Sequence, residues 1–249
     1  EVSSLANAAC VLWLMGKQTK SLQVSKQSIQ LAVEINHPFT STYAHFFHGV
    51  AYQLSGDIAN ALLQAEKTIA LAKKYDFTFW LPTGEMLKAW ALMQENPAEE
   101  FLGLFEESLK AHKQTGNRVA IPYFTALLVG CYLLLEKPAR ALPIIDPCLQ
   151  QINKTGQRFF EPELYRLKAA ALLMSHPHSD KIEHTLQHAI DLATRQSSFT
   201  LLLRATYDLC RIWQQQGKGQ QAIEKLTAIL AQFDDTQASE DLRKAVSLL

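Results

Sequence analysis

The fold is decided by a stretch of 40 residues, residues 37–76, which reads HPFTSTYAHFFHGVAYQLSGDIANALLQAEKTIALAKKYD. In its second half, apolar side chains recur at intervals of three and four residues: Leu62, Ala65, Ile69 and Ala72. This spacing places them on one face of an α-helix. Gly56 divides the stretch near its middle, and glycine readily adopts the left-handed backbone that ends a helix. The stretch therefore predicts two antiparallel helices joined by a tight turn.

The same pattern recurs along the chain with a period of 40 residues. Candidate helix ends fall at two points in each period. The first series is Gly16, Gly56, Asn96, Glu136, His176 and Gly217; the second is Asn36, Asp76, Gly116, Gly156 and Gln196. Several residue types sharing one period indicate internal repeats. A single helix pair cannot bury its apolar stripe, so neighbouring pairs must stack.

We therefore predict an all-α fold, a right-handed superhelical array of antiparallel helix pairs forming a single domain over residues 1–249. The predicted repeats span residues 1–36, 37–76, 77–116, 117–156, 157–196 and 197–236, and a final helix spans 237–249. Ser239 is the expected N-cap of that final helix. Pro143 and Pro147 fall inside the second helix of the fourth repeat, and we expect them to kink it or to delay its start.

Composition excludes several classes of protein. The 249 residues include 24 Lys and Arg against 24 Asp and Glu, so the formal net charge is zero. The balance argues against an electrostatic nucleic-acid binder, and 48% hydrophobic residues argue against disorder. An apolar, uncharged run, residues 119–135, is short for a membrane span and contains Pro122. We expect neither nucleic-acid binding nor membrane insertion.

Cysteine and histidine residues suggest no cofactor. Cys10, Cys131, Cys148 and Cys210 are far apart and form no CxxC pair, which predicts free thiols in a reducing cytoplasm. His184 and His188 are four residues apart, a spacing that can hold a metal ion. No Glu stands at the position that a zinc protease would need and no Cys lies nearby, so we expect a solvated helix face. His45 and His48 are expected to be packing residues.

Small and aromatic residues within the repeats resemble those of tetratricopeptide repeats (TPRs). In residues 37–76 they are Gly49, Tyr52, Gly56, Asp57 and Ala61; in residues 197–236 they are Ala205, Trp213, Gly217 and Ala222. The 40-residue period exceeds the usual length of about 34 residues. The resemblance implies TPR-like pairs with long helices.

Nearly the whole chain resembles, more specifically, the C-terminal TPR-like region of bacterial class III adenylate/guanylate cyclase–STAND ATPase proteins. The resemblance is carried by residues 37–39 (HPF), 52–57 (YQLSGD), 79–81 (FWL), 158–161 (RFFE) and 163–168 (ELYRLK). It implies a fragment of a larger bacterial signalling protein with catalysis upstream of Glu1. Residues 1–249 contain no GxxxxGK[ST] phosphate loop, and we expect no enzyme in this fragment.

The first helix of each pair is expected to line a concave groove. Its candidate lining is Tyr43, Phe46, Gln53, Trp90, Tyr123, Glu163, Arg166, Arg204, Tyr207 and Arg211. Aromatic faces and arginine forks would suit a peptide with an acidic portion. In the alternative interpretation the aromatic residues are core, and the arginines pair with Glu161, Glu163 and Asp208.

The expected function is a protein- or peptide-interaction and regulatory module. Its partner would be a protein, a peptide or another domain of the parent chain. Two alternatives stay open: a small-molecule sensor, or an oligomerisation scaffold that forms a homo-oligomer. The aromatic cluster of Phe77, Phe79, Trp80 and Leu81 is expected to seal two repeats together; its alternative role is an exposed hot spot for a partner.

Overall fold

The computed structural model describes residues 1–233 and 239–249, which form thirteen helices and no strand. The predicted all-α class is confirmed. The chain divides into two compact units. The first unit comprises residues 1–13 and 17–119, and the second comprises residues 14–16 and 120–249. None of the described helices is long and apolar enough to cross a membrane.

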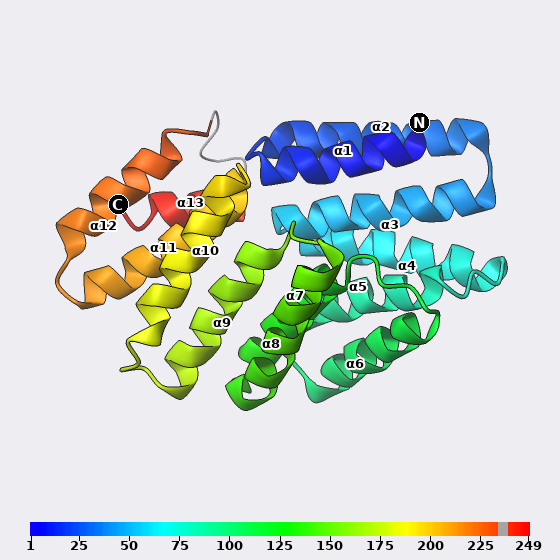
Figure 1. The fold of residues 1–249 in the computed structure, drawn as a ribbon. Coiled ribbons are helices and arrows are strands. Elements are labelled where there is room, and N and C mark those ends of the chain that lie inside the picture. Colours follow the sequence, from blue (N-terminus) through cyan, green and yellow to red (C-terminus); the bar gives the residue numbers. More distant parts are fainter. Residues whose placement is uncertain (234–238) are drawn as a thin grey trace. The chain divides into compact units, whose positions relative to one another are not determined.

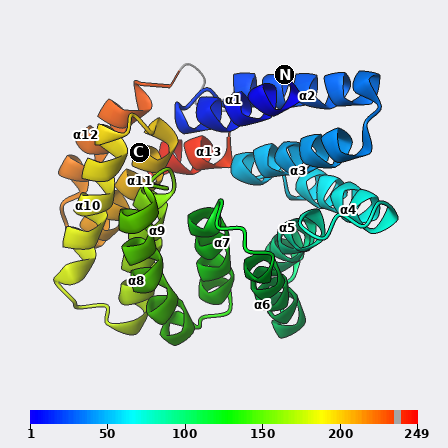
Figure 2. The same cartoon turned by 45° about the vertical axis from the view of Figure 1, so that its right-hand side comes forward.

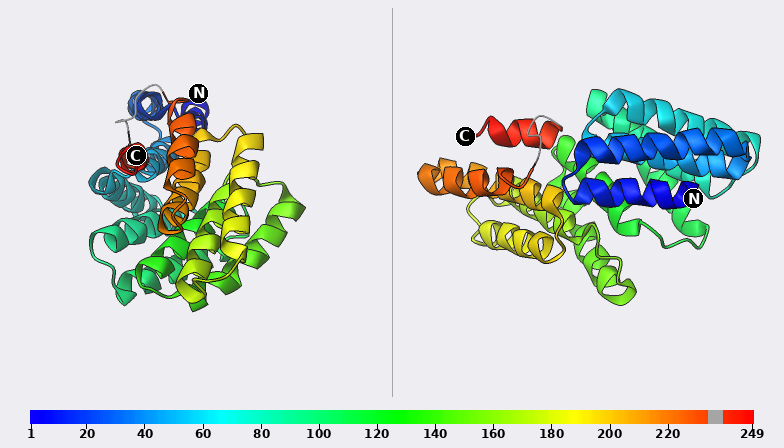
Figure 3. Two further views of the ribbon diagram at one scale, coloured as in Figure 1. Left: turned by 90° about the vertical axis from the view of Figure 1, so that its left-hand side faces the viewer. Right: turned by 90° about the horizontal axis from the view of Figure 1, so that it is seen from above.

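The first unit consists of three successive helix pairs (Figure 2). Its helices are α1 (Val2–Leu14), α2 (Gln18–Ile35), α3 (Pro38–Ser55), α4 (Ile58–Lys74), α5 (Trp80–Glu95) and α6 (Glu99–Gln114). From α2 onward each helix packs against the next, and α3 also packs against α5. Ser21 and Ser28 of α2 donate to backbone carbonyls of α1, which lies alongside (Figure 3). The first helices of neighbouring pairs therefore stack on one another.

The second unit is likewise built of successive helix pairs (Figure 1). Its helices are α7 (Ile121–Leu134), α8 (Pro138–Thr155), α9 (Glu161–Ser175), α10 (Lys181–Arg195), α11 (Phe199–Gln215), α12 (Gly219–Leu230) and α13 (Glu240–Val246). Helix α9 contacts α7 and α11, the first helices of the neighbouring pairs, and also packs against α8 and α10. Helix α13 packs on α11 and α12.

Most predicted helix ends carry a left-handed backbone. In the two series, Gly16, Gly56, Glu136, Gly217, Asn36, Asp76, Gly116 and Gly156 have φ between 51° and 81°. Asn96 and His176 have negative φ instead, of −148° and −144°. After α10 the left-handed residue is Ser197, one position beyond the predicted Gln196. The 40-residue period therefore marks the positions where the chain reverses direction. The residues at these positions adopt more than one backbone conformation.

Glu136 stores backbone strain that glycine would relieve. Its φ is 53°, a conformation that costs a side-chain-bearing residue about 1 kcal/mol. Replacing Glu136 with glycine is therefore expected to raise the free energy of unfolding by about 0.5–1 kcal/mol, measured by urea denaturation. Glu136→Ala keeps the strained Cβ and is the matched control. Equal stability of the two variants would show that this turn is not strained.

Helix α8 departs from the prediction made for its prolines. It begins at Pro138, in the first turn where a missing N–H is tolerated, and runs through Pro143 and Pro147 without a delayed start. The expected delay was wrong. Both inner prolines, and Ala139 one turn before them, lie on the exposed face. Water can therefore hydrate the carbonyls that lose their helical donors. A kink at these prolines stays a prediction.

Trp80 joins two neighbouring helix pairs of the first unit. Only 4% of its surface is exposed. Its ring lies 5.5 Å from those of both Tyr43 and Phe46 on α3, and 4.7 Å from that of Phe79. Edge-on aromatic contacts of this kind add to the stabilisation that burial provides. The cluster thus seals α5 against α3, which is the first of the two roles predicted for it.

The C-terminal helix begins at the predicted cap. Ser239 accepts a hydrogen bond from the backbone N–H of Leu242 at 3.3 Å, and Leu242 and Ala245 are buried against α11 and α12. In Figure 3, α13 lies beside α12. The predicted boundary between the sixth repeat and the final helix, at residues 236–237, lies outside the described residues.

Candidate functional site

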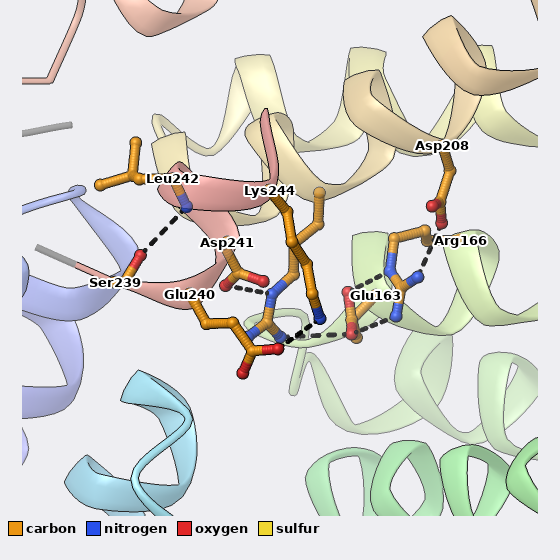
Figure 4. Close-up of polar contacts among 9 residues, drawn as sticks. Glu163, Arg166, Asp208, Ser239, Glu240, Asp241, Leu242 and Lys244 are labelled. Atoms are coloured by element: carbon orange, nitrogen blue, oxygen red, sulfur yellow. Dashed lines mark hydrogen bonds and ion pairs between the residues drawn. The ribbon is translucent and has the colours of Figure 1, made fainter. Parts of the chain in front are cut away.

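A network of charges centred on a buried carboxylate ties α9, α11 and α13 together in the second unit (Figure 4). Its centre is Glu163, whose side chain is 7% exposed. Arg166 donates to the Glu163 carboxylate through Nε at 2.9 Å and Nη2 at 2.8 Å. Arg204 on α11 donates to the same carboxylate at 3.3 Å. One carboxylate on α9 is therefore shared by an arginine of the same helix and an arginine of α11.

Two further carboxylates complete the network. Arg166 Nη1 donates to Asp208 at 2.7 Å, and Arg204 Nε donates to Asp241 of α13 at 2.8 Å. We call these five residues, Glu163, Arg166, Arg204, Asp208 and Asp241, the arginine network. Burial alone would raise the pKa of the Glu163 carboxyl, but the charges of and hydrogen bonds from Arg166 and Arg204 lower it to about 2. Glu163 is therefore ionised near neutral pH.

A cavity of about 270 Å³ adjoins the network. It lies toward the C-terminal ends of α7, α9 and α11 and reaches the start of α10. Its wall is mainly aliphatic: Leu133, Leu173, Met174, Ile182, Leu186 and Ile212. Leu173 and Met174 remain 37% and 43% exposed. The apolar wall therefore continues from the cavity onto the accessible surface.

Three charged residues also line this cavity: Arg166, Asp208 and Arg211. Arg166 and Asp208 pair with each other within the arginine network. Arg211 is exposed, its guanidinium lies 5.9 Å from the ring centre of Tyr207, and it forms no ion pair with any residue in the described part of the chain. The cavity thus combines an apolar wall with one cation that has no ionic partner within those residues.

The structure separates the predicted groove residues into three groups. Glu163, Arg166 and Arg204 form the arginine network, while Tyr207 and Arg211 lie beside it and the cavity. Tyr123 is buried, 5.2 Å from the ring of Phe160. In the first unit, Phe46, Gln53 and Trp90 are buried, and Tyr43 is half-buried against Trp80.

The pairings of the alternative interpretation are present for Glu163 and Asp208, but Glu161 pairs with Arg158 instead. The aliphatic wall of the cavity was not among the predicted residues. A signal for it exists in the sequence, because residues 169–174 read AAALLM, six apolar residues in succession. Such a run covers more than one helix face and leaves some apolar side chains outside the core.

No third metal ligand joins His184 and His188 in the described part of the chain. Among residues 1–233 and 239–249 there is no group of three or more His, Cys, Asp or Glu residues able to hold a metal ion. His188 packs edge-on against Tyr165, with ring centres 4.5 Å apart. None of the four cysteines forms a disulfide bond. Burial raises the pKa of Cys10 and of Cys131 to about 12, which keeps these thiols protonated.

His48 is a buried packing residue of the first unit. Its Nδ1 lies 2.7 Å from the Ser25 hydroxyl on α2. Burial, followed by the charges of His45, Lys67 and Lys26, lowers the pKa of His48 to about 4. Protonating His48 in the folded state would place a cation between apolar helices and near other cations, so the fold favours its neutral form.

Stability is therefore expected to fall as the pH decreases from 7 to 5. The unfolded chain takes up the His48 proton near pH 6.5 and the folded chain only near pH 4, so the His48 contribution is complete above pH 6.5 and is lost below it. The loss for His48 is about 2 kcal/mol between pH 7 and 5, measured by urea denaturation. His48→Gln should remove this part of the slope, whereas His184→Gln on an exposed face should retain it.

The stacked helix pairs define the molecule as a TPR-like helical-repeat protein. No family model matches the chain. It is 18% identical over 209 residues to an uncharacterized protein of Rhizobium meliloti (strain 1021), a match covering 84% of this chain. The matched region spans only 20% of that protein's length.

A solved structure shares the fold. It is that of a Podosopora anserina protein described as a kinesin light chain with nearly identical TPR-like repeats. The TM-score is 0.50 at 14% sequence identity, and the match covers 78% of this chain and 95% of the other. At this identity the likeness concerns the fold alone, and it agrees with the repeat pattern of the sequence.

Proposed function

We propose that the chain is a protein- or peptide-interaction module and that its binding site is the cavity of the second unit. The observation that carries the proposal is the aliphatic cavity with Leu173 and Met174 exposed at its edge and Arg211 beside it. Stacked helical repeats create extended surfaces that bind partners. Apolar side chains that stay accessible next to a cavity are typical of interaction sites.

A regulatory role within a larger signalling protein extends this proposal. The chain resembles the TPR-like region of cyclase–ATPase proteins, and its match to the Rhizobium meliloti protein covers a fifth of that chain. A partner that binds two states of the parent protein with different affinity shifts the balance between them. The module would then act on catalytic domains of the parent chain without performing chemistry itself.

The cavity also supports a second candidate function, a small-molecule sensor. Pockets for drug-sized ligands usually hold about 300–1,000 Å³. The volume of about 270 Å³ lies just below this range and suits a single side chain better. A sensor would be stabilised thermally by its metabolite, and the stabilisation would grow with the logarithm of the ligand concentration once that concentration exceeds the dissociation constant.

Site-specific photo-cross-linking in the source organism tests the proposed function. Benzoylphenylalanine replaces Gln215, which is exposed and lines the cavity, or Gln150, which is exposed on α8 away from it. We expect a protein adduct from position 215 and none from position 150. An adduct with a second copy of this chain would favour the scaffold alternative. The absence of any protein adduct from position 215 would contradict the proposal.

A further inference from the structure

We infer that the cavity of the second unit binds a large apolar side chain of a peptide that carries a carboxylate next to it, and that Arg211 pairs with this carboxylate. The inference rests on the proposed function and names the chemistry of the partner. It concerns one occupant, a peptide segment of a protein partner.

The apolar part of the inference follows from the wall of the cavity. Leucine, isoleucine and methionine side chains from α7, α9, α10 and α11 surround it. An apolar group that enters is transferred from water to a hydrocarbon environment, which is favourable in proportion to the area buried. The volume of about 270 Å³ accommodates one large side chain. Anchoring side chains of this kind contribute much of the binding energy of protein interfaces.

The polypeptide nature of the occupant follows from the surface around the cavity. Leu173 and Met174 line the cavity at the C-terminal end of α9, and each is more than a third exposed. These side chains would contact residues on either side of an anchor, which a ligand confined to the cavity would not reach. Main-chain and neighbouring groups of a peptide would cover them.

The acidic part of the inference follows from the charges of the lining. Arg166 and Arg211 contribute two positive charges and Asp208 one negative charge, so the charged lining carries one net positive charge. Arg166 already pairs with Asp208 and Glu163. Arg211 is the lining cation with no ion pair among the described residues, and it is exposed. An arginine can bind a carboxylate through two parallel hydrogen bonds.

The arginine network holds the two helices that frame this site. Arg166 of α9 pairs with Asp208 of α11 at 2.7 Å, and Arg204 of α11 pairs with Glu163 of α9 at 3.3 Å. The spacing of the α9 and α11 walls is therefore set before a peptide arrives. Such preorganisation lowers the entropic cost of binding.

The test is a selection of random peptides displayed on phage against the intact chain, followed by fluorescence polarisation of the enriched peptides. We expect enriched sequences to share a large apolar residue with Asp or Glu within four positions. Ala170→Trp fills the cavity and should weaken binding about 30-fold or more. Arg211→Glu should weaken it about tenfold and shift selection toward Lys and Arg.

Arg195→Glu is the matched control, because Arg195 is an exposed arginine of the same unit that does not line the cavity. It should leave affinity unchanged. Circular dichroism verifies folding, and the surface variant Arg211→Glu keeps the inference testable if Ala170→Trp does not fold. Peptides that bind all variants equally would overturn the inference while leaving an interaction module elsewhere on the chain. Selection of no peptide, with thermal stabilisation by octanoate, would overturn it in favour of the sensor function.

Discussion

Replacement of Glu163 with alanine is expected to lower the free energy of unfolding by about 3–5 kcal/mol. The change leaves Arg166 and Arg204, whose side chains are only 19% and 18% exposed, without the carboxylate that they share. Asp208 and Asp241 still pair with the two guanidinium groups, but the central carboxylate that offsets the desolvation of both is gone. Urea denaturation monitored by circular dichroism measures the effect.

Glu240→Ala is the matched control for Glu163→Ala. Glu240 of α13 also pairs with a basic residue, Lys244 at 2.6 Å, but both side chains are about half exposed. An exposed pair of this kind contributes about 0.5 kcal/mol or less. Similar losses for the two variants would show that the arginine network is solvated in solution and does not hold α9 to α11.

Replacement of Trp80 with alanine is expected to cost about 3–5 kcal/mol of stability, for a different reason. The change removes a buried indole ring between α3 and α5 and leaves a cavity among Tyr43, Phe46 and Phe79. Because Trp80 belongs to a buried aromatic contact and not to an ion pair, its effect should be insensitive to salt. Thermal and urea denaturation of the variant at two salt concentrations would measure both properties.

Two further variants test whether the packing of the Trp80 ring, and not its N–H group or a more exposed ring of the cluster, provides the stabilisation. Trp80→Phe should cost less than about 1.5 kcal/mol, because the indole N–H has no hydrogen-bond partner within the described residues. Phe39→Ala, at a ring that is 46% exposed, should cost markedly less than Trp80→Ala. If Trp80→Ala were as mild as Phe39→Ala, the cluster would not seal the two helix pairs.

The repeat period predicts the helices because each turn between helices needs a particular backbone conformation, and that conformation favours certain residue types. Gly56, Gly116, Gly156 and Gly217 all adopt the left-handed conformation that glycine permits. The prediction is weaker where a helix ends through a different backbone conformation. Asn96, for example, follows α5 with an extended backbone. The delayed start expected for α8 was wrong because Pro143 lies on an exposed face, where water can hydrate the carbonyls that lose a donor.

The candidate site was less predictable than the fold. The sequence indicated Arg166, Arg204 and Glu163 as candidate groove residues. Whether these side chains face a partner or pair with each other depends on distances between helices one repeat apart. Asp241 lies 37 residues from Arg204, in a helix outside the regular period. The cavity depends on how Leu173, Ile182 and Ile212 pack, which follows from side-chain placement and has no repeating signature.

The most direct test of the central claim is hydrogen–deuterium exchange of the intact chain at a saturating concentration of a selected peptide. We predict slower amide exchange at residues 169–174 of α9 and 208–215 of α11, the segments that frame the cavity. Exchange in α4 and α6 should be unchanged. Protection confined to other helices, or no protection at saturation, would contradict the assignment of the binding site to the second unit.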